Sequence, residues 1–122
     1  MPIVIVEVVT GANDFIARDL AQSLADAVGR ALKSPPGQTW IRLRSLPREQ
    51  YAENESLLDA VDLPVFVTIL TRQPPQGVDL ESEVAALTRS IAEVIARPVP
   101  CVHVEYAPAA LGRLSFGGTL VQ

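Results

Sequence analysis

The feature that most constrains the fold is a repeated order of predicted elements, which occurs twice along the 122 residues. In the first half an Ile/Val run and a later alternating segment predict strands, and apolar residues at helical spacing between them predict a helix. These elements are expected at residues 2–9, 39–45 and 14–33, respectively. The second half repeats the order, with strands expected at 64–71 and 101–106 and a helix at 79–97. Both halves therefore read as β-α-β units.

Two such units predict a single domain of the α/β (α+β) class. A strand–helix–strand connection is almost always right-handed and gives two parallel strands with the helix on one face. We expect a four-stranded sheet with two helices on one face, built from pseudo-repeat halves 1–62 and 63–122. Because the predicted strands are largely apolar on both faces, the face without helices should meet another protein surface. Self-association is therefore expected.

Composition narrows the class of partner. A formal net charge of −4 argues against a nucleic-acid-binding protein, which needs a basic face. One His and one Cys supply too few ligands for a metal site, and the single Cys fits a reducing, cytoplasmic compartment. The first strand is too short for a membrane span. Nine of the ten basic residues are arginine, which binds carboxylates well, so a small anionic substrate is expected.

The second residue, Pro2, is the strongest candidate for chemistry. Removal of Met1 would leave Pro2 with a free secondary amine at the start of a buried strand. Burial and nearby cations disfavour the charged form of an amine and so lower its pKa toward neutrality. A base of that kind suits proton abstraction beside a carbonyl group. The alternative is that Pro2 only begins a strand, where its missing N–H is harmless.

Three features together resemble one known family: the Met-Pro start, the tandem β-α-β units and the glycine-rich tail at 112–118. They resemble the tautomerase superfamily, and most closely the fused members of its 4-oxalocrotonate tautomerase group, over nearly the whole chain. The resemblance implies an isomerase that needs no cofactor and assembles as a homotrimer. It also implies that Pro2 is the catalytic base or acid. The role does not extend to Pro64, which begins the second half but has an amide nitrogen.

The family's substrate-binding residues are carried over to matching positions. Arg42, Arg44 and Arg72 are the candidates for holding a substrate carboxylate, whereas the loop 10–13 lacks the arginine that short members have there. Leu114 and Phe116 resemble the hydrophobic wall around the family's proline. Similar stretches in fused members bring a tyrosine near the site, here Tyr51, although an aromatic anchor for the loop is the simpler interpretation.

The leading hypothesis is keto-enol tautomerisation of small 2-keto or 2-hydroxy unsaturated acids, with neutral Pro2 as general base. A second hypothesis is a hydratase or dehalogenase in which protonated Pro2 acts as an acid and a carboxylate activates water; the candidate carboxylates are Glu7, Glu53 and Glu105. A third is an inactive trimeric binding protein. Arg44 and Glu105 are expected either to form an ion pair inside the oligomer or to line a polar site, and His103 is expected to have a structural role.

Overall fold

The computed structural model describes residues 2–57 and 63–122. Its first half contains strand β1 (Ile3–Thr10), helix α1 (Leu20–Ala31), strand β2 (Trp40–Pro47) and a short 3-10 helix at Arg48–Gln50. Its second half contains strand β3 (Val65–Leu70), helix α2 (Gly77–Ile95), a 3-10 turn at Val99–Cys101 and strand β4 (Val102–Tyr106). A hairpin of β5 (Ser115–Phe116) and β6 (Thr119–Leu120) follows. The predicted boundary between the halves lies between residues 62 and 63, and residue 62 is outside the described residues.

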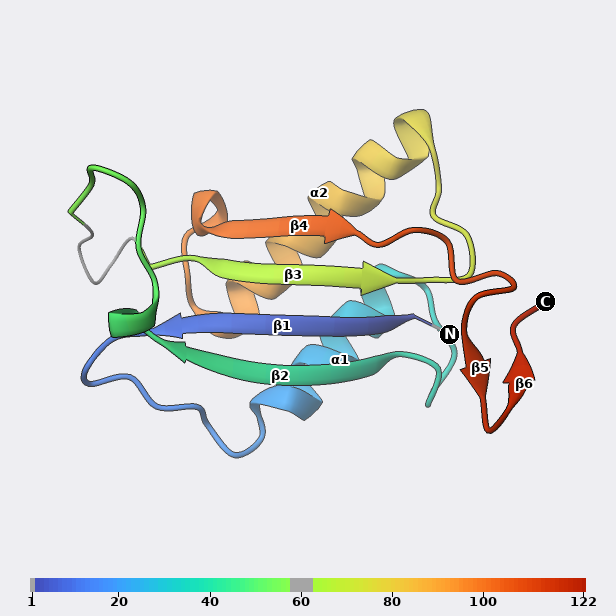
Figure 1. Cartoon of the computed structure of the whole chain (residues 1–122), viewed down its shortest axis with the longest axis horizontal. Coiled ribbons are helices and arrows are strands. Elements are labelled where there is room, and N and C mark those ends of the chain that lie inside the picture. Colours follow the sequence, from blue (N-terminus) through green and yellow to red (C-terminus); the bar gives the residue numbers. More distant parts are fainter. Residues whose placement is uncertain (1, 58–62) are drawn as a thin grey trace.

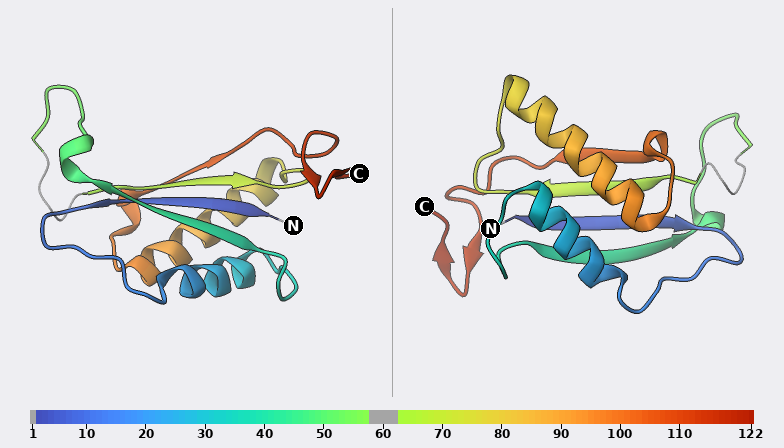
Figure 2. Two further views of the ribbon diagram at one scale, coloured as in Figure 1. Left: turned by 60° about the horizontal axis from the view of Figure 1, so that its bottom comes forward. Right: turned by 180° about the vertical axis from the view of Figure 1, so that it is seen from behind.

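The four long strands form one sheet in the order β2-β1-β3-β4 (Figure 1). Each half contributes a parallel pair, β1 with β2 and β3 with β4, and the halves meet where β1 runs antiparallel to β3. Both helices cover the same face of the sheet and pack beside each other (Figure 2). The predicted four-stranded sheet with two helices on one face is therefore confirmed.

The core lies between the sheet and the helices. Alternate residues of the central strands point into it and are almost completely buried, among them Val4, Val6, Val65, Val67 and Ile69. Helix α1 contributes Leu24 and Val28, and α2 contributes Leu87 and Ile91. Burying a side chain of this size stabilises the fold by roughly 1.5–3 kcal/mol relative to exposure. This layer packs along β1 from Val4 to Val8.

The start of the first helix was predicted wrongly. The helix begins at Leu20 rather than at residue 14. Instead the Asp14 carboxylate accepts a hydrogen bond from the Gly11 backbone N–H at 2.7 Å and lies 3.4 Å from the Arg97 guanidinium. A local side-chain bond of this kind competes with helix formation.

Other boundaries differ by one or two residues from expectation. The second helix starts and ends two residues earlier than predicted, since Ala96 after its last turn takes the left-handed conformation with φ 61°. Gly117 and Gly118, in the glycine-rich tail, form a tight turn: both residues have positive φ and close the β5–β6 hairpin.

Candidate functional site

Pro2 is buried at the start of β1. Its carbonyl oxygen accepts a hydrogen bond from the Trp40 backbone N–H at 3.0 Å, which ties it to the start of β2. Side chains alternate along a strand, so Pro2 lies on the same face as Val4 and Val6, the face that the helices cover. The residue expected to carry the chemistry is thus fixed by the core rather than by a loop.

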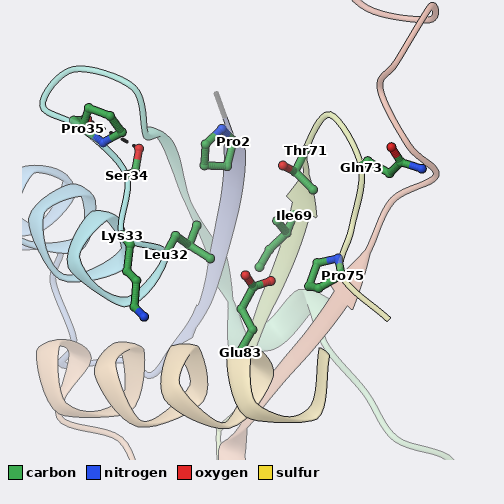
Figure 3. Close-up of a pocket in the computed structure, with 10 residues that line it drawn as sticks. All are labelled: Pro2, Leu32, Lys33, Ser34, Pro35, Ile69, Thr71, Gln73, Pro75 and Glu83. Atoms are coloured by element: carbon green, nitrogen blue, oxygen red, sulfur yellow. Dashed lines mark hydrogen bonds between the residues drawn. The ribbon is translucent and has the colours of Figure 1, made fainter. Parts of the chain in front are cut away.

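A cavity of about 280 Å³ opens beside Pro2. Figure 3 shows that three segments surround it: the end of α1 and the turn after it, the end of β3 with its following loop, and one side chain from α2. The described residues that line it are Pro2, Leu32, Lys33, Ser34, Pro35, Ile69, Thr71, Gln73, Pro75 and Glu83. We call this cavity the Pro2 pocket.

The topology explains why these segments meet. A helix in a β-α-β unit runs opposite to its strands, so α1 ends where β1 begins. Because β3 is antiparallel to β1, the end of β3 and the beginning of α2 lie at the same end of the sheet as the start of β1. Residues from both halves are therefore combined around a single proline.

Lys33 lines the Pro2 pocket and has an unusual backbone conformation. It directly follows the α1 C-cap, Leu32, and has φ 55°, in the left-handed region that favours glycine. The turn is closed by hydrogen bonds from Lys33 N to Arg30 O and from Ser34 N to Gly29 O, at 3.1 and 2.8 Å. A non-glycine residue in this region costs roughly 1–2 kcal/mol. The strain coincides with the pocket that the lysine lines.

Glu83 supplies a carboxylate to the opposite side of the pocket. Its Oε2 accepts a hydrogen bond of 2.5 Å from the Tyr106 hydroxyl at the end of β4. Burial, followed by the bond to this carboxylate, raises the pKa of Tyr106 well above its usual value. Tyr106 therefore stays protonated as a donor and fixes the direction of the Glu83 side chain.

The predicted arginines of β2 lie elsewhere in the single chain. Arg42 and Arg44 are exposed on the sheet face that no helix covers. In register, Arg42 neighbours Ile5 and Arg44 neighbours Glu7. Neither lines the Pro2 pocket, so a role in that pocket stays a prediction that would need a second chain.

The remaining predicted residues lie near the C-terminal hairpin. Arg72 Nε donates a 2.5 Å hydrogen bond to the Gln122 carbonyl oxygen, while its chain neighbours Thr71 and Gln73 line the Pro2 pocket. Leu114 lines a separate cavity of about 220 Å³. Phe116 packs edge-on against Trp40, with ring centroids 5.1 Å apart. Their roles as a wall for the substrate stay predictions.

The carboxylates named for water activation are all away from the Pro2 pocket within one chain. Glu7 lies on the open sheet face, which is the face that no helix covers. Glu53 accepts a hydrogen bond from the Tyr51 hydroxyl at 2.6 Å, and Glu105 accepts one from the Thr68 hydroxyl at 3.1 Å. Tyr51 packs against Phe66, with ring centroids 5.8 Å apart. It follows the end of β2 that is farther from Pro2.

His103 and Glu105 also lie on the open face. The His103 ring lies 5.6 Å from that of Phe66. Arg44 and Glu105 are on the two outer strands with β1 and β3 between them, so the expected pair would have to join two chains.

Lys33 and Glu83 were not among the predicted site residues. The sequence carries a usable signal for Lys33, because it ends a predicted helix whose C-terminus must face the start of β1. Glu83 has no comparable signal, since it stands among other polar residues of α2. In the ranges 2–57 and 63–122 no group of three His, Cys, Asp or Glu residues is arranged to hold a metal ion. Within the same ranges no helix is long and apolar enough to cross a membrane.

Solved structures show which fold this arrangement represents. Pt0534 inactivated by 2-oxo-3-pentynoate is 14% identical, with 98% of this chain and 94% of that chain covered and a TM-score of 0.72. A fused 4-OT described as a symmetric trimer is 15% identical, with the same coverage and TM-score. The macrophage migration inhibitory factor from Trichinella spiralis is 15% identical, with 97% and 98% covered and a TM-score of 0.73. No protein-family model matches the sequence, and no curated protein matches it significantly.

The chain has the fold of the tautomerase superfamily. Within that fold its two tandem β-α-β units resemble the fused 4-OT proteins over nearly the full length of both chains.

Proposed function

We propose that the protein is an isomerase that tautomerises small 2-keto or 2-hydroxy unsaturated acids, with the Pro2 amine, freed by loss of Met1, as general base. The observation that carries the proposal is the burial of Pro2 beside a cavity of about 280 Å³ that Lys33 also lines. A cation at that place favours binding of a carboxylate and stabilises a developing enolate oxygen. The inactivation of Pt0534 by 2-oxo-3-pentynoate, a 2-keto acid, in the same fold supports this substrate class.

In this mechanism the substrate carboxylate binds near Lys33. The neutral Pro2 nitrogen takes a proton from the enol hydroxyl or from the carbon next to the carbonyl, and becomes a secondary ammonium. The ammonium then returns the proton to another carbon of the conjugated system, which regenerates the base. Leu32 and Ile69 line the cavity with apolar surface, which limits the access of bulk water to the amine.

A homotrimer completes the proposal. The open sheet face presents Trp40, which is 51% exposed, together with Arg42, Arg44 and apolar residues of the central strands. Contact through that face would bury the apolar residues and bring guanidinium groups of one chain near another chain. The trimer described for a fused 4-OT of this fold supports the assembly, and light scattering should give the mass of three chains. We place the protein in the cytoplasm because it has one cysteine.

Hydration of an unsaturated acid, with Pro2 protonated, is the second candidate. Glu83 favours it, because a carboxylate in the same pocket stabilises an ammonium and can prepare a water molecule for addition. The two candidates differ in pH dependence. For a neutral base, kcat/KM rises with pH and reaches a plateau, whereas for an acid it falls as pH rises.

Substitution of Pro2 by alanine tests the proposed function. The variant replaces the secondary amine at the pocket, so kcat/KM for phenylenolpyruvate should fall by about 10²-fold or more. Pro64→Ala is the matched control, because Pro64 is also a buried proline before a central strand but has an amide nitrogen. Equal activity of Pro2→Ala and the unsubstituted protein would contradict the proposal and leave the inactive binding protein as the better account.

A further inference from the structure

Two charged side chains of opposite sign, Lys33 and Glu83, line the Pro2 pocket. Lys33 reaches from the end of α1, and the Glu83 carboxylate rises from α2 toward Ile69 and Pro2 (Figure 3). In the described parts of the chain these two side chains do not form an ion pair within 4.0 Å. The pocket is therefore lined by one cationic and one anionic side chain, and the Lys33 side chain extends toward α2 (Figure 3).

The two charges differ in how firmly they are held. Lys33 is exposed, so water and salt screen it, and its long side chain can move. Glu83 is half-buried, and the Tyr106 hydroxyl holds its Oε2 at 2.5 Å. Among the described residues no protein donor takes its Oε1. The Glu83 carboxylate is therefore held more firmly than the Lys33 ammonium.

We infer that Glu83 makes this pocket selective for monocarboxylates with an uncharged distal end by weakening the binding of dicarboxylates. The inference rests on the proposed function for the identity of the substrate class. A monocarboxylate can place its acid group near Lys33 and direct its other end toward Glu83. A dicarboxylate of similar length must bring a second anion toward the fixed carboxylate.

The size of the cavity determines the expected effect. A volume of about 280 Å³ is that of a sphere roughly 8 Å across, so a second carboxylate that stays inside the cavity lies within about that distance of Glu83. Repulsion between two carboxylates at about that distance, reduced by partial exposure to solvent, corresponds to a loss of affinity of about tenfold.

The test compares two ligands that differ only in the second carboxylate, 2-oxopentanoate and 2-oxoglutarate. Their dissociation constants are measured by calorimetry or NMR at one ionic strength for the full-length protein, Glu83→Gln and Glu81→Gln. Glu81 is the matched control, because it is exposed on α2 two residues away and does not line the pocket. The unsubstituted protein and Glu81→Gln should bind 2-oxopentanoate about tenfold more tightly, and Glu83→Gln should bind both ligands about equally.

Tyr106→Phe gives a second route to the same conclusion, since it keeps the carboxylate but removes the group that holds it. The preference for 2-oxopentanoate should decrease and not disappear in that variant. Circular dichroism and thermal melting establish that each variant is folded.

The inference is overturned if the unsubstituted protein binds both ligands equally, if it binds neither, or if Glu83→Gln keeps the preference. Failure of the proposed function has a different signature. In that case Pro2→Ala would not change turnover of phenylenolpyruvate, while the dependence of ligand preference on Glu83 could still hold. In kinetics, Glu83→Gln should lower the ratio of the KM for the dicarboxylate 2-hydroxymuconate to the KM for phenylenolpyruvate about tenfold, whereas the control Glu81→Gln should leave that ratio unchanged.

Discussion

Single residues decide the chemistry of the Pro2 pocket, and Tyr106 and Glu83 illustrate how they are coupled. The phenol is protonated in the fold because burial and the carboxylate next to it both disfavour the phenolate. Tyr51, the only other tyrosine, has its pKa raised to about 12, first by its hydrogen bond to Glu53. Both phenols should therefore resist ionisation.

Ionisation of Tyr106 can be followed by phenolate absorbance in the variant Tyr51→Phe, which has no other tyrosine. Because the folded pKa is raised, the fold keeps the Tyr106 proton at a pH where the unfolded chain, with a pKa of about 10, has lost it. Its contribution to the free energy of unfolding is fully present below about pH 10 and declines as pH rises through the folded pKa. Little phenolate should form at about pH 10–11 in the folded protein. A midpoint near the pKa of a free tyrosine, about 10, would contradict the bond to Glu83.

At this scale the sequence predicts the site only in part. Pro2 follows from the family resemblance and from its place directly before a predicted strand. Glu83 does not follow, because its role depends on the end of β3 approaching α2 and on a tyrosine 23 residues later. The roles of Arg42, Arg44 and Arg72 depend on neighbouring chains that one sequence does not place.

The helices and strands are predicted well where the pattern of apolar residues in the sequence matches the residues that are buried in the fold. Both central strands form where apolar runs predicted them; burial alternates along β3 and along β1 as far as Val8. The prediction fails at the start of α1, where Asp14 bonds to Gly11 and pairs with Arg97, 83 residues away. Arg97 also donates to the carbonyl oxygens of Leu63 and Val9, at 2.8 and 2.9 Å. Contacts so distant in sequence leave no local pattern.

The two helix ends provide a prediction about elements. Lys33 and Ala96 both follow a helix in the left-handed conformation, with φ 55° and 61°, where glycine is favoured. Lys33→Gly and Ala96→Gly should each raise the free energy of unfolding by about 1 kcal/mol, measured by denaturant titration.

The two variants should differ in ligand binding. Lys33→Gly removes the cation from the Pro2 pocket and should weaken 2-oxopentanoate binding, whereas Ala96→Gly, which is not in the pocket, should leave it unchanged. Weaker stability in both variants would show that neither backbone is strained. Unchanged binding in Lys33→Gly would remove Lys33 from the site.

The whole molecule explains how one pocket is built from two similar halves. Because β1 pairs antiparallel with β3, the end of α1 and the beginning of α2 lie at the same end of the sheet, beside Pro2. Of the two prolines that precede central strands, only Pro2 can have a free amine. The pseudo-equivalent Pro64 is buried at the far end of the same strand pair. Under the proposed function, the duplicated fold has one site of this kind per chain, and the proposed trimer forms through the sheet face that no helix covers.

The central claim is that Pro2 carries a free amine that exchanges protons beside the pocket. It is tested most directly by NMR titration of the Pro2 nitrogen in protein labelled with ¹⁵N-proline and purified from cells. The account predicts an amine signal that titrates with a midpoint near neutral pH and shifts when 2-oxopentanoate binds. An amide signal that does not change with pH, as expected if Met1 remains attached, would contradict it.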